Sequence, residues 1–231
     1  VWDHLKNHCE NKDALKNYTI DWMEFMPAKR ESRRYVGAYV LNQKDLEEGA
    51  VFPDAICHGG WTMDDHNPVG FSDNRGPKKA TEFNQCKPGY SIPWRSLYSR
   101  NISNLLFAGR DASCTHMAMS STRVMGTCLV MGEAVGVGVG LMLEKGLQTP
   151  ELDDAGVREL QQRLLIDDVY VPGAALDKGA YMSGASFNVK DAALAIDGVS
   201  RKVDDDLHYC EIKVGEPFCC ELAAAEPVSQ I

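Results

Sequence analysis

The chain has 231 residues, of which 44% are hydrophobic, and its formal net charge is −9. This length and composition are typical of a globular protein with one large domain, or with one domain and part of another. The negative charge argues against nucleic acid and anionic membrane surfaces as partners, because both attract proteins that present a positive face.

The first 89 residues carry short helix, strand and turn signals. Residues 20–26 and 34–41 are rich in aromatic and branched side chains, which predicts two strands. Asp45 is placed to cap a short helix that Gly49 ends. The loop at 67–89 is longer than most structural connections, which favours a functional role. Apolar residues at helical spacing predict a further helix at the start of the chain (Trp2, Leu5, Cys9 and Leu15). The first residues are neither a basic leader nor a start methionine, so we expect the chain to begin inside a longer protein.

The middle of the chain combines a short apolar run with a long apolar segment. Residues 105–108 are typical of a buried parallel strand. Residues 122–143 are apolar on all sides, which predicts either a core helix or a membrane span. We favour a buried core helix and no membrane span, because Glu133 lies at its centre. We expect a group of three polar residues to cap this helix (Ser120, Ser121 and Thr122), and its glycines to permit tight packing (Gly132, Gly136, Gly138 and Gly140).

The last part of the chain begins with a predicted helix and continues with short strand-like pieces. Asp153 or Asp154 is placed to cap a helix whose apolar side carries Val157, Leu160 and Leu164. After residue 172 the chain contains short strand-like pieces and turns, too few for a complete sandwich of about 100 residues. The sequence therefore predicts an α/β fold mixed with α+β features. It includes a parallel strand, a buried Gly-rich helix and an incomplete β unit.

A candidate binding site lies between the predicted apolar strand and the long helix. Gly109 follows the strand, where a residue without Cβ lets a ligand approach the backbone. Arg110 and Asp111 offer a forked donor and a carboxylate acceptor. The helix start near Arg123 and Gly126 carries unpaired N–H groups and partial positive charge. These features favour a cofactor with an electron-rich edge. The alternative is an ordinary turn at the end of a strand.

A second candidate is a polar cluster that contains His58, Asp64, Asp65 and His66. Its spacing matches no standard metal site, and the eight cysteines form no CxxC pair, so we predict no metal and free thiols. A histidine there could accept a proton near neutral pH. Solvated loop residues are the alternative.

Three more side chains lie near the binding site in sequence. Arg95 could orient a substrate or simply pair with an acidic residue. His116, in the loop before the long helix, could reach the reactive face of a cofactor or be a surface residue. Cys114 has no base placed by sequence to activate it.

Five segments together resemble the C-terminal part of FAD-dependent oxidoreductases, a bacterial family often encoded with polysaccharide-degrading enzymes. They are residues 34–41, GGWTMDDH at 59–66, IPWRSL at 92–97, NLLFAGRD at 104–111 and STRVMGT at 121–127. The resemblance covers roughly residues 30–173. It implies FAD as the cofactor and flavin-mediated hydride transfer from a small, sugar-like substrate.

The resemblance also assigns roles. Asp111 would hold the ribityl chain of the flavin, and the helix start would face its pyrimidine edge. The expected cofactor-binding residues are Gly109, Arg110, Asp111, Arg123, Gly126 and Thr127. The candidates for substrate or proton handling are His66, Asp64, Arg95 and His116.

The resemblance further divides the chain into three parts. Residues 1–89 are similar to part of a substrate domain, and residues 90–171 to the C-terminal part of the FAD-binding domain. Residues 172–231 resemble the start of a galactose-binding-like β-sandwich that would hold carbohydrate. The family's N-terminal GxGxxG is not found here, so we expect this chain alone to bind FAD weakly or not at all. The alternative is a non-enzymatic carbohydrate-binding or interaction fragment.

Overall fold

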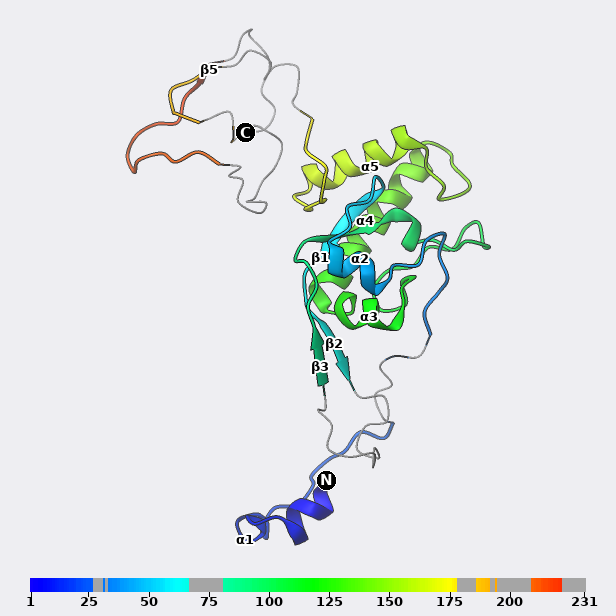
Figure 1. The fold of residues 1–231 in the computed structure, drawn as a ribbon, viewed down its shortest axis with the longest axis vertical. Coiled ribbons are helices and arrows are strands. Elements are labelled where there is room, and N and C mark those ends of the chain that lie inside the picture. The colour runs from blue at the N-terminus through cyan, green and yellow to red at the C-terminus, as the bar shows by residue number, and fades with distance from the viewer. Residues whose placement is uncertain are drawn as a thin grey trace. The chain divides into compact units, whose positions relative to one another are not determined.

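A computed structural model describes residues 1–26, 31, 33–66, 81–177, 186–191, 194 and 209–221. The predicted loop at 67–89 falls largely outside these residues. Contacts divide the chain into two units, Val1–Ser32 and Arg33–Ile231, and each is described by itself. The described residues combine helices with small two-stranded sheets, which confirms the predicted mixed α/β class (Figure 1).

The first unit contains two short helices, η1 (His4–His8) and α1 (Lys12–Leu15). The Lys6 ammonium joins them, because it donates to the backbone carbonyls of Leu15, Lys16 and Tyr18 at 2.7–3.0 Å. This unit therefore holds together through polar contacts, since neither helix buries a residue. The structure shows no strand at 20–26, where one was predicted, and the large apolar side chains there are exposed.

The second unit begins with extended chain and the short helix α2 (Gln43–Glu48). Asn42 is its N-cap and accepts from the Lys44 N–H at 3.0 Å, while Asp45 accepts from the Asn42 N–H at 2.9 Å. Asp45 is thus the third helical residue of a capping box and not the N-cap that we predicted, because Asn42, three residues earlier, caps the helix. Gly49 ends the helix in the left-handed conformation with φ +65°, as predicted.

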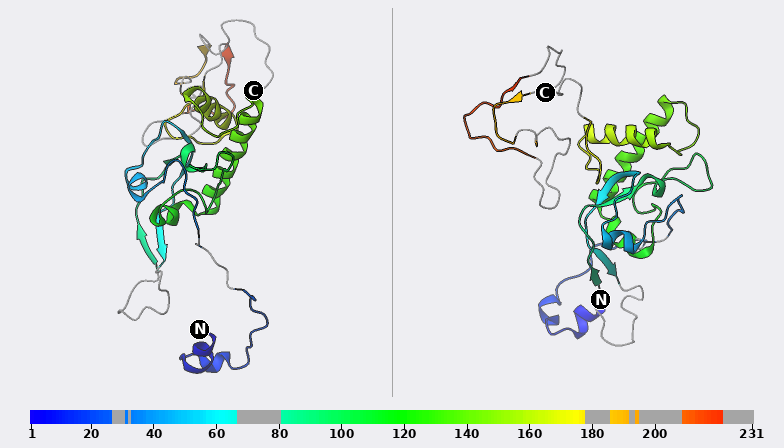
Figure 2. Two further views of the ribbon diagram at one scale, coloured as in Figure 1. Left: turned by 90° about the vertical axis from the view of Figure 1, so that its right-hand side faces the viewer. Right: turned by 45° about the horizontal axis from the view of Figure 1, so that its top comes forward.

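The core lies around an antiparallel pair, β1 (Ala55–Gly59) with β4 (Tyr90–Pro93). Nearly all residues of these two strands are buried. The long helix α4 (Met125–Glu144) and the helix α5 (Asp154–Ile166) pack against each other and against β1 (Figures 1 and 2). Asp153 caps α5 by accepting from the Gly156 N–H at 2.8 Å, which confirms one of the two predicted caps.

Helix α4 is only partly a core helix. Its buried side includes Met131, Ala134 and Leu141, but Leu129 and Leu143 are 73% and 76% exposed. Within the described residues, it is the one helix long and apolar enough to cross a membrane by length and composition, and a third of that stretch is buried. The buried side of α4 packs against β1 and α5.

The glycines of α4 have different surroundings. A Cβ on Gly138 would lie 2.5 Å from Cη2 of Trp94, so the helix approaches that buried ring closely. The prediction of tight packing was wrong for Gly132, Gly136 and Gly140, because a Cβ there meets no described atom within 4 Å.

Two predicted strands form only isolated bridges. Residues 34–41 contribute Gly37, which pairs with Ser99, and Leu41, which pairs in parallel with Cys114. The run at 105–108 contributes Leu106, which pairs antiparallel with Tyr98. The run at 105–108 is therefore not the buried parallel strand that we predicted, because its bridge is antiparallel. Neither run forms a strand, since a strand needs a neighbouring edge over several residues.

In the tail, β5 (Ser186–Phe187) pairs antiparallel with β6 (Cys220–Glu221). The Phe187 and Phe218 rings stack at a centroid distance of 5.7 Å. This local pairing agrees with a β unit after residue 172.

Candidate functional site

The strand β2 (Met63–His66) and the helix α3 (His116–Thr122) bring four of the predicted site residues together. β2 pairs with β3 (Thr81–Asn84) and packs against α3. Successive side chains on a strand point in opposite directions, so Asp64 and Asp65 diverge. Asp65 reaches His116, the first residue of α3, and Asp64 reaches Arg123, just beyond its last residue. Two adjacent carboxylates thus hold the two ends of one helix.

The pair between Asp64 and Arg123 is mostly buried, with side chains 20% and 14% exposed. Arg123 Nη2 lies 3.3 Å from Asp64 Oδ2 and donates to the Asp64 backbone carbonyl at 3.1 Å. Arg123 is the C-cap of α3 and lies two residues before α4. The pair therefore positions the connection between the two helices.

Asp64 carries one polar atom without a hydrogen bond. Its Oδ1 is buried and makes no hydrogen bond within the described part of the chain. His66 Nε2 lies 3.5 Å away, close enough for an ion pair but long for a hydrogen bond. A buried carboxylate oxygen without a donor is costly, so this atom is suited to accept a hydrogen bond from a bound group.

The pair between Asp65 and His116 is more accessible. Asp65 Oδ1 and His116 Nε2 are 2.8 Å apart, and the side chains are 25% and 46% exposed. Thr115 precedes His116 and caps α3 by accepting from the Ala118 N–H at 3.3 Å. The imidazole is thus anchored on a capped helix and paired with a strand.

The N-terminus of α4 is not capped by a side chain. The residues predicted to cap it, Ser120, Ser121 and Thr122, instead lie buried in the last turn of α3. The chain turns at Arg123, and α4 begins after Val124. The first N–H groups of a helix have no partner within it. Gly126 is exposed, and a Cβ on it would meet no described atom within 4 Å, so its backbone can be approached closely.

The loop at 109–111 lies beside the first turn of α4. A Cβ on Gly109 would be 3.8 Å from both Cβ and Sγ of Cys128. Gly109 has φ +85°, so its left-handed backbone conformation is a reason for glycine here. The Asp111 carbonyl accepts from the Tyr35 N–H at 2.9 Å, which fixes the loop. The structure therefore brings this loop and the start of α4 together.

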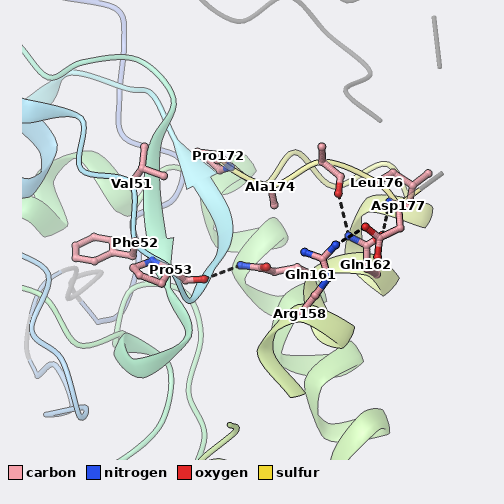
Figure 3. A pocket seen from close by; sticks show the side chains of 12 residues that line it. Val51, Phe52, Pro53, Arg158, Gln161, Gln162, Pro172, Ala174, Leu176 and Asp177 are labelled. Carbon is pink, nitrogen blue, oxygen red and sulfur yellow. Dashed lines mark hydrogen bonds and ion pairs between the residues drawn. The ribbon is translucent and has the colours of Figure 1, made fainter. Parts of the chain in front are cut away.

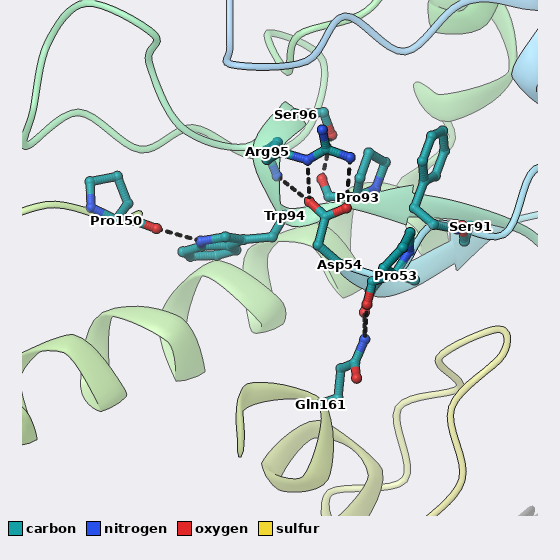
Figure 4. Close-up of polar contacts among 11 residues, drawn as sticks. Pro53, Asp54, Ser91, Pro93, Trp94, Arg95, Ser96, Pro150 and Gln161 are labelled. Atoms are coloured by element: carbon teal, nitrogen blue, oxygen red, sulfur yellow. Dashed lines mark hydrogen bonds and ion pairs between the residues drawn. The ribbon is translucent and has the colours of Figure 1, made fainter. Parts of the chain in front are cut away.

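Arg95 is held elsewhere, in the contacts drawn in Figure 4. Its Nε and Nη2 donate to the two Asp54 carboxylate oxygens at 2.9 and 3.0 Å. Its guanidinium also lies over the Tyr39 ring. The hydrogen bonds that Arg95 donates to Asp54 raise the pKa of Arg95, and burial raises the pKa of Tyr39 to about 12. These contacts support the structural alternative for Arg95, because both Asp54 oxygens are used to hold it.

His58 makes a contact outside the predicted polar cluster, and the environment of Cys114 does not activate its thiol. His58 Nδ1 lies 3.0 Å from the Tyr170 carbonyl oxygen, so this histidine is directed toward the residues after α5. Cys114 is buried, and burial raises the pKa of its thiol to about 11. A thiol with a raised pKa is a poor nucleophile at neutral pH. In the ranges that the structure describes, no three His, Cys, Asp or Glu side chains form a possible metal site.

A cavity of about 490 Å³ lies between α5 and residues 172–177 (Figure 3). Its polar groups are engaged with the protein: Gln161 donates to the Pro53 carbonyl at 2.9 Å, and Arg158 pairs with Asp177. Gln162 likewise donates to the Ala175 carbonyl. None of the predicted site residues lines this cavity, and its polar contacts serve to hold residues 172–177 against α5.

Sequence reasoning missed two partners in these sites. Asp65 was seen only as a member of a local cluster, whereas its partner His116 is 51 residues away. Asp54 was not singled out, although it is 41 residues from Arg95 and binds it with both oxygens. No local spacing signals either pair, since both depend on how strands and helices come together.

Comparison with known proteins gives one match. The family model described as FAD dependent oxidoreductase matches residues 1–164, which is more than half of the chain. No curated protein and no solved structure matched. The chain belongs to the FAD dependent oxidoreductase family.

Proposed function

We propose that the FAD of this oxidoreductase binds where residues 109–111 meet the first turn of α4. The observation that carries the proposal is the N-terminus of α4, which has no side-chain cap and lies beside the Gly109 loop. The residues fit the cofactor, because N–H groups, an exposed glycine and a carboxylate are close together. The proposed contacts are Gly109, Arg110, Asp111, Gly126 and Thr127, with Arg123 holding the helix start.

The chain's own groups have distinct roles in this proposal. Asp111 accepts a hydrogen bond from a ribityl hydroxyl, and the α4 N-terminus directs partial positive charge at the flavin edge. The Asp64–Arg123 pair keeps the turn between α3 and α4 in place. Bound FAD supplies the two-electron acceptor, and the protein supplies position and electrostatics.

The proposed substrate is a small, sugar-like molecule that is handled by the β2–α3 side of the site. His66, Asp64 and His116 are the proposed groups for substrate and proton handling. Their support is location: all three lie on β2 or at the start of α3, and both histidines are about half exposed. Arg95 stays a weaker candidate, because Asp54 holds its guanidinium.

We propose that the chain has three parts: residues 1–89 belong to a substrate domain, residues 90–171 to the FAD-binding domain and residues 172–231 to a β domain. For residues 172–231 we propose an incomplete β-sandwich-like domain that binds carbohydrate. The pairing of β5 with β6 and the stacked Phe187 and Phe218 rings support a β unit there. A sugar-like substrate would suit an enzyme whose last domain binds carbohydrate.

The test is an FAD titration of the whole chain, monitored by quenching of flavin fluorescence and carried to high FAD concentration, because we expect this chain to bind FAD weakly. Asp111→Ala removes a charged hydrogen-bond acceptor, which contributes about 1.5–3 kcal/mol, so affinity should fall at least about tenfold. Glu133→Ala is the control, because it removes one exposed negative charge further along α4. Equal affinity of the two variants would refute the proposed placement of the cofactor.

A further inference from the structure

A pair of aromatic side chains lies beside the loop at 109–111. The backbone N–H of Tyr35 donates to the Asp111 carbonyl at 2.9 Å. The Tyr35 ring stacks on the Phe107 ring at a centroid distance of 5.2 Å and an interplanar angle of 24°. Phe107 and Asp111 flank Gly109 in the sequence, one on each side. The aromatic pair is therefore next to the glycine whose backbone a ligand can approach closely.

The two rings of the pair differ in exposure. Phe107 is 5% exposed, whereas Tyr35 is 49% exposed. Phe107 covers one face of the Tyr35 ring, so the exposed half of the Tyr35 side chain is open to a second planar group. A large ring that is half in solvent gains further apolar burial when a planar ligand covers it. The pair thus offers a supported aromatic surface at the edge of the loop.

The backbone around Tyr35 is fixed on both sides of this contact. Besides the hydrogen bond of Tyr35 already described, the Val36 carbonyl accepts from the Arg100 N–H at 3.3 Å. Gly37 forms an antiparallel bridge with Ser99. A side chain that is held in place before a ligand arrives loses little conformational freedom when the ligand binds.

The same loop also lies beside the first turn of α4. A Cβ on Gly109 would be 3.8 Å from Sγ of Cys128. Burial raises the pKa of the Cys128 thiol, and the charges of Arg110 and Asp111 also act on that thiol. The loop is therefore in contact with the helix start, which offers polar groups, and with Tyr35, which offers an aromatic surface.

We propose that Tyr35 stacks on the isoalloxazine ring of bound FAD. This contact depends on the proposed function, because it extends the cofactor site at residues 109–111 and the start of α4. In that site Asp111 accepts a hydrogen bond from the ribityl chain, which is joined directly to the isoalloxazine ring. A side chain anchored on the Asp111 carbonyl is thus close to where the ring system begins. Tyr35 supplies the flat apolar face, and Phe107 supports it.

Other aromatic side chains fit this role less well. The Tyr39 ring is already covered, because the Arg95 guanidinium lies over it at 5.4 Å from the ring centroid. Trp61 is 53% exposed, but its carbonyl accepts from the Ser121 hydroxyl, which places Trp61 beside α3. Tyr35 combines an open ring with a direct hydrogen bond to the loop.

The first test is an FAD titration of the whole chain that carries Tyr35→Leu, extended to high FAD concentration. The substitution removes the ring and keeps the backbone N–H that binds Asp111. Affinity should fall about fivefold, which corresponds to about 1 kcal/mol and is typical of an aromatic pair. Tyr209→Leu is the matched control, because Tyr209 is 47% exposed, and it should leave the affinity unchanged.

The outcomes of this titration are distinct. If FAD binds equally to the unchanged chain and to Tyr35→Leu, the inference is wrong, although the proposed function stands. If the unchanged chain binds no FAD, the proposed function itself fails.

The second test separates a ring contact from a role in folding. Tyr35→Phe keeps the flat face that packs on Phe107 but removes the phenol. A tyrosine in contact with an excited flavin quenches its fluorescence by lending it an electron, which phenylalanine does not do. FAD affinity should therefore stay within about twofold, because the stacked pair remains. The fluorescence lifetime of bound FAD should lengthen severalfold. An unchanged lifetime would show that Tyr35 does not contact the isoalloxazine ring and would overturn the inference.

Discussion

The contact between Gly138 and Trp94 gives a quantitative test of how α4 packs. In Gly138→Ala, the new Cβ would lie 2.5 Å from Cη2 and 2.9 Å from Cζ3 of the ring. Trp94 is only 1% exposed, and its Nε1 donates to the Pro150 carbonyl at 2.7 Å, so the ring cannot move freely (Figure 4). Overpacking costs up to about 3 kcal/mol, while alanine gains about 1 kcal/mol in helix propensity. We expect a net loss of about 2 kcal/mol.

Gly136→Ala is the matched control on the same helix. Its Cβ meets no described atom within 4 Å, so only the gain in helix propensity of about 1 kcal/mol remains. The two variants should differ by about 3 kcal/mol, or about 1.5 M in urea midpoint for an m value of ~2 kcal/mol/M. Urea unfolding followed by circular dichroism measures this difference. Equal stability of the two variants would refute the close approach of α4 to Trp94.

Further predictions concern three other sites in the second unit. Asp54→Ala should lower the free energy of unfolding by about 1–2 kcal/mol in urea titrations, a modest loss because Arg95 is nearly half exposed; an unchanged midpoint would show that the pair is not structural. Asn42→Ala removes the cap of α2 and should cost about 1 kcal/mol in the same assay, whereas no loss would contradict the capping box. Burial raises the pKa of Cys114 from its ordinary 9.0 to about 11, so iodoacetamide at pH 8 should modify the exposed Cys219 much faster. Because the raised pKa belongs to the folded state, the protonated thiol favours folding below about pH 9, and this contribution is lost as the pH rises through about 11. The free energy of unfolding, measured across this pH range, should therefore fall as the pH rises.

Two helix ends that depend on neighbouring residues were predicted correctly, whereas the predicted caps of α2 and α4 were wrong. Asp153 caps α5, and Gly49 ends α2 in the left-handed conformation. Both are decided by groups within one helical turn, so the local sequence contains the necessary information. The predicted start of α4 was three residues early, because Thr122 is the last residue of α3 and the chain turns at Arg123 before α4 begins.

The site was predicted in parts rather than as an arrangement. The residues of the 109–111 loop and the helix start were identified because each has a local chemical signal. Gly109 lies close to Cys128 in the first turn of α4, and the role of these residues in binding a cofactor stays a prediction. The pairing of Asp65 with His116 was not predicted, because either residue alone is compatible with a solvated loop.

The sequence by itself determined the fold class, the Asp153 cap of α5 and the likeness to FAD-dependent oxidoreductases, since composition, local hydrogen bonding and motif spacing depend on residues close together in the chain. Only the tertiary structure decided which glycine of α4 is needed for packing and which carboxylate orients which basic side chain. Gly136 and Gly138 have the same local sequence character, yet only Gly138 lies against Trp94. The physical reason is that packing and ion pairing depend on distances between segments that are far apart in sequence, and the fold alone sets those distances.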